Sequence, residues 1–379
     1  MKQFFTLLFS LLVAQVVFSQ SVVRTISHDG IQRSYRLYVP SVYDGSEAVP
    51  LLFNLHGYTS NALQQEAYGD FRPIADTANF ILVHPDGTQD QSGTTFWNAF
   101  GSPTETVDDV GFISALIDSL NAEYNIDLNR VYSTGMSNGG FMSYRLACAL
   151  SSRIAAIASV TGAMIDPSFL ACSPSHPTPA MQIHGTADPT VPYNGSTGVL
   201  GAVESAEYWV TFNNCNPTPV ETLVPDIDMT DMCTADHFVY SGGDAGSAVE
   251  LYRVNGGAHT WPGTNPFFST LGITNQDFSA SVEIWRFFSQ YRLNELVGIE
   301  DGQSAKRFSV FPNPSTGEVN IQFENAVNRT IQVQNSLGQT VQKFNSNSKS
   351  FNLNLDESGV YVLTVISEKG TISEKLIVE

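Results

Sequence analysis

Basic side chains are scarce in this chain of 379 residues, where 18 lysines and arginines stand against 37 aspartates and glutamates. The formal net charge at pH 7 is −19. Nucleic acids and anionic membrane surfaces repel a protein with this charge. The composition therefore excludes partners of both kinds and favours neutral or weakly charged substrates.

Long apolar runs are missing except at the N-terminus, where Lys2 precedes an apolar stretch from Phe4 to Phe18. A positive end, an apolar centre and a cleavage site after Ser19 are typical of a secretory signal, so residues 1–19 are predicted to be one. The run is short and contains Gln15, which argues against a stable membrane span. The sequence thus predicts export.

Cysteine is also scarce, with only Cys148, Cys172, Cys215 and Cys233. Export makes disulfides possible, so bridges are expected rather than metal ligands or nucleophiles. Four cysteines allow three pairings. We expect the two pairs that are local in sequence, Cys148 with Cys172 and Cys215 with Cys233. Four free buried thiols are the alternative.

Short apolar runs alternate with longer helical stretches over residues 20–296, after a predicted β-hairpin that turns at Asp29-Gly30. This alternation predicts an α/β fold with a mostly parallel central sheet and crossover helices. The expected strands are residues 51–55, 80–84, 131–134, 155–160, 180–184 and 249–254, and the expected helices are 110–124, 202–212 and 279–291.

A polar and charged stretch, residues 297–307, predicts a linker. Residues 308–379 then alternate apolar and polar side chains in short runs broken by Gly, Asn and Ser, which predicts a small all-β sandwich. This unit contains no Cys, His or Trp, so no chemistry is expected there. A carbohydrate-binding module is the weaker alternative, because no cluster of aromatic side chains is present for stacking.

A serine lies where a predicted strand meets a predicted helix, in the turn Gly135-Met136-Ser137-Asn138-Gly139. Such a turn strains the serine, needs small neighbours and lifts the hydroxyl into a site at the helix N-terminus. Ser137 is therefore the candidate nucleophile. The pattern alone is only moderately informative, because an ordinary serine beside a flexible loop also matches it.

An activated serine needs a base that an acid orients, and in this fold they follow in the order serine, acid, histidine. His259 lies in a glycine-rich loop after the strand 249–254 and is the expected general base. Asp188 follows the strand 180–184 and is the expected acid.

Several residues compete with these two. The rival acids are Asp166 and the run of Asp226, Asp228 and Asp231. That run lacks the glycine and the distal glutamate of a calcium-binding loop, so it is interpreted as a solvated loop. No metal and no cofactor are predicted. The remaining histidines are expected to lie at the surface or to have structural roles.

Two backbone amides are expected to stabilise the oxyanion, those of Tyr58 and Asn138. Gly57 allows the loop before Tyr58 to turn its amide toward the site. Trp97 and Trp261 are candidates for a hydrophobic wall that stacks an aromatic acyl group, with core packing as the alternative.

Seven segments between about His28 and Tyr291 resemble, in order and spacing, secreted polyhydroxybutyrate depolymerase-like and feruloyl or acetylxylan esterase-like enzymes. They are His56-Gly57, His84–Gly87, Trp97-Asn98, Val107–Phe112, the turn at Ser137, His184–Asp188 and His259–Gly263. The resemblance implies an α/β-hydrolase fold, the triad Ser137, Asp188 and His259, and extracellular attack on esters of plant polysaccharides or polyesters. Tyr58 departs from many relatives, which have a smaller residue or cysteine there.

The C-terminal unit resembles the type IX secretion sorting domain. The residues that carry this resemblance are Phe311–Pro314 with Gly317, Asn335–Gln339, Ser358–Tyr361 and Lys375–Val378. It implies transport across the outer membrane by the type IX machinery, followed by release or attachment at the cell surface.

The sequence as a whole predicts an extracellular serine esterase that acts on polymer-linked esters through an acyl-enzyme on Ser137. Two other classes stay open. One is a serine peptidase of the same fold, which would need a cap that shapes a peptide tunnel. The other is a non-catalytic glycan-binding surface protein delivered by the sorting domain.

Overall fold

The computed structural model describes residues 20–101, 107–265, 272–296, 308–323, 325–335, 339–367 and 370–378. The predicted signal (1–19) and the predicted linker (297–307) lie outside the described residues. The chain divides into two compact units, Met1–Val297 and Gly298–Glu379. All four tryptophans belong to the first of them.

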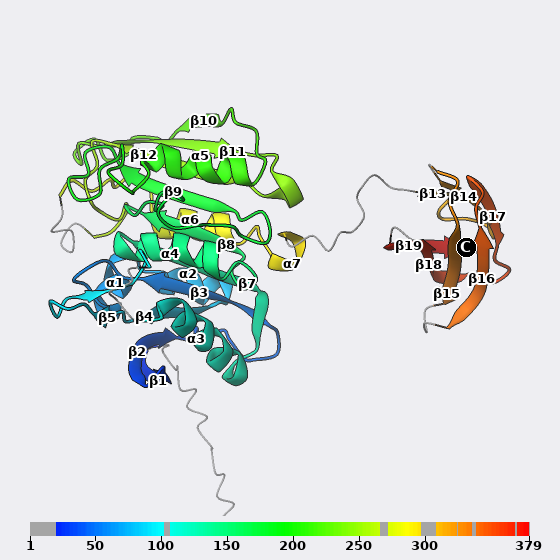
Figure 1. The fold of residues 1–379 in the computed structure, drawn as a ribbon, viewed down its shortest axis with the longest axis horizontal. Coiled ribbons are helices and arrows are strands. Elements are labelled where there is room, and N and C mark those ends of the chain that lie inside the picture. The colour runs from blue at the N-terminus through cyan, green and yellow to red at the C-terminus, as the bar shows by residue number, and fades with distance from the viewer. Residues whose placement is uncertain are drawn as a thin grey trace, which may run out of the picture. The chain divides into compact units, whose positions relative to one another are not determined.

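The first unit is built on a sheet of ten strands in the order β1-β2-β4-β3-β7-β8-β9-β12-β11-β10 (Figure 1). The six strands from β4 to β12 in this order are parallel, and two antiparallel strands flank them on each side. This confirms the α/β prediction. The strands are β1 (Val22–His28), β2 (Ile31–Tyr38), β3 (Val49–Leu55), β4 (Ile81–Pro85), β7 (Ile126–Met136), β8 (Ala156–Val160), β9 (Ala180–Gly185), β10 (Val220–Leu223), β11 (Thr234–Tyr240) and β12 (Val249–Asn255).

Helices cover both faces of this sheet, because neighbouring residues of a buried strand point to opposite sides. In β3, Leu51 and Phe53 pack into one apolar cluster and Leu52 into the other. Helices α3 (Asp109–Glu123), α4 (Asn138–Ala149) and α5 (Ala202–Phe212) supply the first cluster, and α2 (Arg72–Ala78) and α6 (Ala280–Phe288) the second. The shorter elements are α1 (Ala62–Tyr68), α7 (Leu293–Leu296), the 3-10 turn Asp244–Gly246 and the small ribbon of β5 (Thr88–Gln89) and β6 (Thr95–Phe96).

In the described residues of the second unit, the strands pair antiparallel in a three-stranded sheet β13-β14-β17 and a four-stranded sheet β16-β15-β18-β19. Side chains from both sheets, among them Ile321 and Leu363, share one apolar cluster, so the sheets pack as a sandwich. The strands are β13 (Phe308–Phe311), β14 (Glu318–Phe323), β15 (Arg329–Asn335), β16 (Thr340–Ser346), β17 (Ser350–Asn354), β18 (Gly359–Ser367) and β19 (Gly370–Val378). Among all described residues, no helix is long and apolar enough to cross a membrane.

One of the two predicted disulfides is present. Cys148 and Cys172 are bonded, with their Cα atoms 4.8 Å apart, which ties the end of α4 to the long loop after β8.

The predicted pair Cys215–Cys233 is wrong, because both thiols are free and buried. Cys215 Sγ lies 3.8 Å from the Ser247 carbonyl, just before β12, whereas Cys233 precedes β11 and faces the other apolar cluster. The intervening strand of seven residues separates the two ends by about 20 Å. A disulfide tolerates less than about 7 Å between Cα atoms.

Candidate active site

Ser137 occupies a sharp turn between β7 and α4, with φ 52° and ψ −119°. This left-handed conformation is strained for a residue with a side chain. The Ser137 amide donates to the Val160 carbonyl of β8 at 2.8 Å, and the Ser137 carbonyl accepts from Phe141 at 3.0 Å. The turn is therefore held from both neighbouring elements, while the hydroxyl stays at the helix N-terminus.

Close backbone packing explains why glycine follows the serine turn. A Cβ atom added at Gly139 would lie 2.6 Å from the Leu55 carbonyl carbon, at the end of β3. Backbone cannot move away as a side-chain end can, so α4 reaches this close to the sheet only with glycine at this position.

Asp188 and His259 form the second part of the site. His259 Nδ1 donates to Asp188 Oδ2 at 2.7 Å, and both side chains are buried. Burial by itself raises the pKa of the Asp188 carboxyl, but hydrogen bonds from His184 and His259, together with the His259 charge, hold that pKa well below its usual value. The carboxylate is therefore ionised and fixes the proton on Nδ1, which leaves His259 Nε2 free to accept one.

Backbone hydrogen bonds join the loops that carry these two residues. The Ala187 amide donates to the Gly257 carbonyl at 3.0 Å, and the Gly256 amide donates to the Thr186 hydroxyl at 2.9 Å. The acid loop after β9 and the base loop after β12 are thus one connected structure. Because β7, β9 and β12 are parallel, all three candidate residues leave the same edge of the sheet.

Ser137 and His259, both among the described residues, are not hydrogen-bonded to each other in this structure. Catalytic hydrogen bonds are often long in the free enzyme and tighten when substrate binds. The structure therefore joins Asp188 to His259 directly and places Ser137 at the same sheet edge.

The loop after β3 approaches the serine. A Cβ atom added at Gly57 would lie 3.4 Å from Ser137 Cβ, so this loop runs directly beside the candidate nucleophile. His56 braces the loop: its Nε2 accepts from the Gly87 amide at 2.9 Å, and its Nδ1 donates to the Gly57 carbonyl at 2.7 Å. Burial lowers the His56 pKa, although the Gly57 bond opposes this shift. The ring of Tyr58 turns to the surface, where its hydroxyl donates to Asp90.

The other candidate for the oxyanion site, Asn138, is the first residue of α4, and its side chain holds Trp97. The Asn138 oxygen accepts from the Trp97 amide at 2.6 Å, and the Asn138 nitrogen donates to the Trp97 carbonyl at 3.1 Å. The Trp97 indole in turn donates to the His56 carbonyl at 3.0 Å. Asn138, Trp97 and His56 are therefore linked by hydrogen bonds beside the loop after β3.

Neither of the two candidate stacking tryptophans offers a face to a substrate in this structure. Trp97 and Trp261 are each 1% exposed. Trp261 packs edge-on against Phe71 and donates to the Ser281 hydroxyl, inside the cluster under α6. Both tryptophans therefore pack in the interior, which was the alternative to a substrate-stacking role.

A different aromatic pair, which the sequence did not indicate, packs at the start of α4, one turn after the candidate nucleophile. The Phe100 ring is 49% exposed and lies 5.3 Å from the ring of Phe141, whose amide binds the Ser137 carbonyl. The available signal was the position of Phe141, one helical turn after Ser137.

The rival acids lie in ordinary loops. Asp166 accepts from the Ser168 amide within its own turn, and Asp228 accepts from Thr230 in the same manner. Asp231 accepts from the Cys233 and Gln276 amides and so fixes the loop before β11. No described histidine other than His184 and His259 pairs with Asp188.

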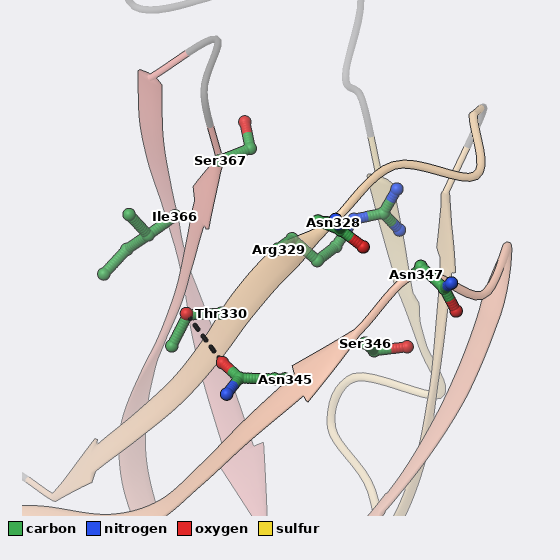
Figure 2. Close-up of a pocket in the computed structure, with 8 residues that line it drawn as sticks. All are labelled: Asn328, Arg329, Thr330, Asn345, Ser346, Asn347, Ile366 and Ser367. Carbon is green, nitrogen blue, oxygen red and sulfur yellow. Dashed lines mark hydrogen bonds between the residues drawn. The ribbon is translucent and has the colours of Figure 1, made fainter.

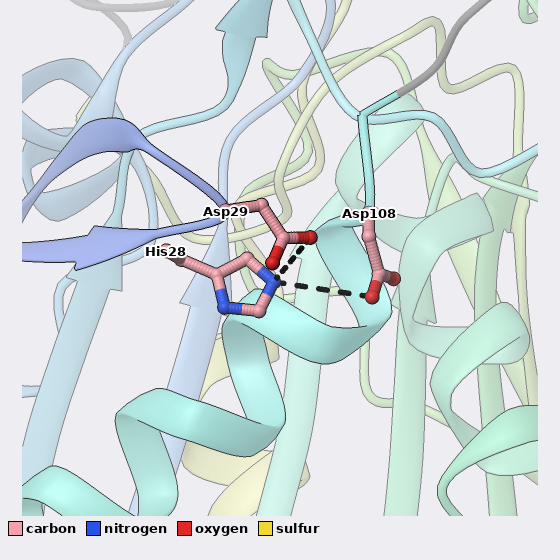
Figure 3. Close-up of side chains that lie close together, drawn as sticks. All are labelled: His28, Asp29 and Asp108. Atoms are coloured by element: carbon pink, nitrogen blue, oxygen red, sulfur yellow. Dashed lines mark ion pairs between the residues drawn. The ribbon is translucent and has the colours of Figure 1, made fainter.

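Among the described residues, one grouping has the geometry to hold a metal ion, formed by His28, Asp29 and Asp108 (Figure 3). His28 Nε2 lies 3.5 Å from Asp29 Oδ2 and 3.9 Å from Asp108 Oδ2. Both carboxylates are exposed, and Asp108 also caps α3 through the Gly111 amide. These three side chains thus have a local structural role: they pair with one another at the start of α3, where Asp108 also caps the helix.

A shallow hollow of about 500 Å³ lies in the second unit (Figure 2). Polar side chains of β15 and β16 line it, including Thr330 and Asn345, which are hydrogen-bonded at 2.9 Å. It contains none of the candidate catalytic residues.

Both units match known protein families. Residues 102–241 match the family model described as phospholipase/carboxylesterase, and residues 309–379 match the secretion system C-terminal sorting domain. The second match identifies a sorting domain of the type IX machinery and marks the chain for secretion or attachment at the cell surface.

Curated relatives of the first unit are esterases by name. The chain is 28% identical to a putative esterase of Nocardia uniformis subsp. tsuyamanensis, over 69% of this chain and 80% of that protein. It is 27% identical to a bifunctional acetylxylan esterase/xylanase of Neocallimastix patriciarum, over 76% of this chain and 37% of the relative. It is 30% identical to feruloyl esterase B of Piromyces equi, over 58% of this chain and 41% of that protein. The chain thus spans about two fifths of the length of the last two relatives.

A solved structure supports the fold. An acetyl xylan esterase from Aspergillus awamori superimposes with a TM-score of 0.50 and 11% identity, covering 71% of this chain and 99% of its own. The architecture of the first unit is therefore that of the α/β-hydrolases.

Proposed function

We propose that this chain, an ester-cleaving hydrolase of the α/β-hydrolase fold with a type IX sorting domain, hydrolyses polymer-linked carboxylic esters through an acyl-enzyme on Ser137. The observation that carries the proposal is the 2.7 Å hydrogen bond between Asp188 and His259, on joined loops at the sheet edge where Ser137 lies. An acid, a base and a strained serine at one edge are the parts that acyl transfer requires.

The proposed reaction begins with attack of Ser137 Oγ on the ester carbonyl carbon, while His259 Nε2 takes the hydroxyl proton. The negative oxygen of the tetrahedral intermediate accepts hydrogen bonds from the Tyr58 and Asn138 amides. Each such donor contributes about 3 kcal/mol to lowering the barrier. Collapse of the intermediate breaks the ester C–O bond, and His259 protonates the departing alcohol.

The second half of the reaction releases the acid. His259 takes a proton from a water molecule, whose oxygen attacks the acyl carbon bound to Ser137. The second tetrahedral intermediate collapses, the proton returns to Ser137 Oγ, and the carboxylic acid leaves. Throughout, Asp188 stabilises the charge that His259 gains in each proton transfer.

The names of the relatives support feruloyl or acetyl groups on plant polysaccharide as the substrate class. A polyhydroxyalkanoate-type polyester is the other polymer that fits the proposal. The exposed Phe100, whose ring packs on Phe141 one helical turn after Ser137, supports an aromatic acyl group, because it offers an apolar surface on this part of α4. The net charge of −19 is compatible with neutral esters.

Removing the nucleophile tests the proposal. Ser137→Ala should lower the release of p-nitrophenol from p-nitrophenyl acetate by at least about 10⁴-fold, because no other group can form the acyl-enzyme. A fluorophosphonate should label the wild type, and peptide mapping should find the label on Ser137. Ser168→Ala, at an exposed serine, is the matched control and should keep full activity and labelling.

Unchanged turnover of Ser137→Ala would reject the proposal. Activity of the wild type on feruloylated xylan, acetylated xylan and polyhydroxybutyrate then ranks the substrates. Better turnover of peptides than of any ester would favour a serine peptidase. Xylan binding that survives Ser137→Ala, in a protein that the fluorophosphonate does not label, would favour a glycan-binding role.

A further inference from the structure

The Asp188 carboxylate has a second imidazole neighbour. His184, in β9, is fully buried, and its Nε2 lies 3.3 Å from Asp188 Oδ2, the same oxygen that binds His259 Nδ1 at 2.7 Å. The other oxygen, Oδ1, accepts from the Thr190 and Val191 amides at 2.8 and 2.9 Å. Asp188 is therefore surrounded by donors on both oxygens.

Hydrogen-bond partners fix the protonation of His184. Its Nε2 lies 2.9 Å from the Val191 carbonyl, which can only accept, so Nε2 carries a proton. Its Nδ1 lies 2.9 Å from Gln182 Nε2. The Gln182 amide has one possible orientation, because its nitrogen also donates to the Gly162 carbonyl at 2.7 Å and its oxygen accepts from the Tyr144 hydroxyl at 2.7 Å.

His184 is consequently neutral, with Nε2 as donor and Nδ1 as acceptor. A second proton on Nδ1 would face the amide hydrogens of Gln182, and all of these side chains are buried, so no solvent relieves the conflict. The Nε2–H group that lies 3.3 Å from Asp188 Oδ2 is thus a fixed part of this buried arrangement.

Few other ionisable groups face this arrangement. The Tyr193 ring stands edge-on to His184 with centroids 5.9 Å apart, and Tyr144 is reached only through Gln182. Arg253, which is paired with His184 across β9 and β12, is bonded to Asp236. His259 is the remaining titratable neighbour of the carboxylate.

We propose that His184 is a positioning residue for the reaction on Ser137: its Nε2–H group, bonded to the Val191 carbonyl and 3.3 Å from Asp188 Oδ2, restrains the carboxylate and limits the basicity of His259. The inference rests on the proposed esterase function. A second donor on Oδ2 draws negative charge away from the contact with His259, so protonated His259 is stabilised less than it would be by an unshared carboxylate.

The sign of the effect follows. Without the His184 donor, Oδ2 carries more charge toward His259, which then holds its proton to higher pH. The acid limb of kcat/KM reports protonation of the base in the free enzyme, so its midpoint should rise. One hydrogen bond to a charged group corresponds to a shift of about one pH unit.

His184→Leu tests this by removing the donor, and His184→Gln restores a side-chain N–H of similar reach. We expect the midpoint of the kcat/KM acid limb to rise by about one unit in His184→Leu and to return near the wild-type value in His184→Gln. His176→Gln is the matched control, because His176 is also a buried histidine bonded to two carbonyls. The midpoint of the kcat/KM acid limb in this variant should equal that of the wild type.

Two results would overturn the proposal. One is a fall in kcat/KM of His184→Leu with an unchanged midpoint, which is the signature of a structural role alone. If His184→Leu does not fold, His184→Asn replaces it, since its shorter side chain cannot reach Asp188. Identical midpoints in His184→Asn and His184→Gln are then the second overturning result.

Nitrogen-15 NMR of the histidine rings separates this proposal from the proposed function. The wild-type spectrum should show neutral His184 with its proton on Nε2, and the titration midpoint of His259 should rise in His184→Leu even if no ester is cleaved. Inactivity on esters with this NMR pattern would reject the esterase proposal only. A charged His184, or one protonated on Nδ1, would reject the positioning role only.

Discussion

Replacing Asp188 by asparagine replaces one of the two acceptor oxygens of the carboxylate by an NH₂ group, which can only donate. The two backbone amides that approach Oδ1 and the two imidazoles that approach Oδ2 all offer hydrogens. Whichever way the asparagine amide is turned, its NH₂ group faces two donors. Asp188→Asn therefore cannot reproduce the hydrogen bonds of the carboxylate in either orientation.

The two orientations have different consequences. With NH₂ at the Oδ1 position, the Thr190 and Val191 amides lose their acceptor, and for the buried Val191 amide this costs about 1–3 kcal/mol of folding free energy. With NH₂ at the Oδ2 position, those bonds survive, but His259 must present an unprotonated Nδ1. Its proton then lies on Nε2, where the Ser137 proton has to go. This wrong tautomer lowers kcat by about 10⁴-fold.

We expect the second orientation, because it keeps both backbone bonds. The measured result should be a loss of about 10⁴-fold in kcat on p-nitrophenyl acetate, or about 5.5 kcal/mol of barrier, with only a small change in Tm. Asp166→Asn is the control: this rival acid serves its own turn, so its kcat should stay within about twofold of the wild type. If Asp188→Asn kept a tenth of the wild-type kcat, the role of Asp188 would be refuted.

Three further predictions concern stability. Gly139→Ala should lose about 3 kcal/mol of folding free energy, because its new Cβ atom would collide with backbone atoms. Gly359→Ala is the control and should melt like the wild type, because a Cβ atom there meets only ordinary contacts at 3.6 to 3.8 Å. Equal Tm values for the two variants would contradict this prediction. Reducing the Cys148–Cys172 bond, which spans 24 residues, should cost about 3 kcal/mol, and the double alanine variant should show the same loss with no further effect of reductant. Burial lowers the pKa of His84 from its usual 6.5 to about 4. As the pH falls from 6.5 to 4, the unfolded chain therefore binds a proton at this histidine before the folded protein does. The free energy of unfolding should fall by up to about 3 kcal/mol over that range. Urea titrations of His84→Gln over that range should lack this slope, and an unchanged slope would contradict it.

The central strands and the candidate triad could be predicted because their signals are local. Continuous apolar runs such as residues 51–55 mark strands that are buried on both faces, and Asp29-Gly30 supplies the positive φ angles that a tight hairpin needs. The chain order of Ser137, Asp188 and His259 follows from the order of the parallel strands. These features depend on neighbours in sequence.

What could not be predicted depends on neighbours in space. The edge strand β10 carries Glu221 and Thr222 and its neighbour β11 carries Asp236, so both lack the apolar run that marked the central strands. Pairing cysteines by sequence distance ignored the strand that separates Cys215 from Cys233.

Burial is the other property that the sequence does not give. Trp97 was a candidate for stacking on the substrate, yet its ring is enclosed, while Phe100, three residues later, is exposed. The hydrogen bonds of His184 were equally hidden, because its partner Gln182 is oriented by Tyr144 of α4 and its partner Val191 lies in the loop after β9.

The confinement of all four tryptophans to the first unit gives the protein a built-in spectroscopic label. Fluorescence excited at wavelengths that tyrosine does not absorb will report on the α/β-hydrolase unit alone, in the full chain and without an attached dye. Unfolding of the sorting domain, whose aromatic residues are phenylalanine and tyrosine, will be silent in that signal and visible by circular dichroism. Comparing the two signals in one denaturant titration will show whether the two units unfold together or one after the other.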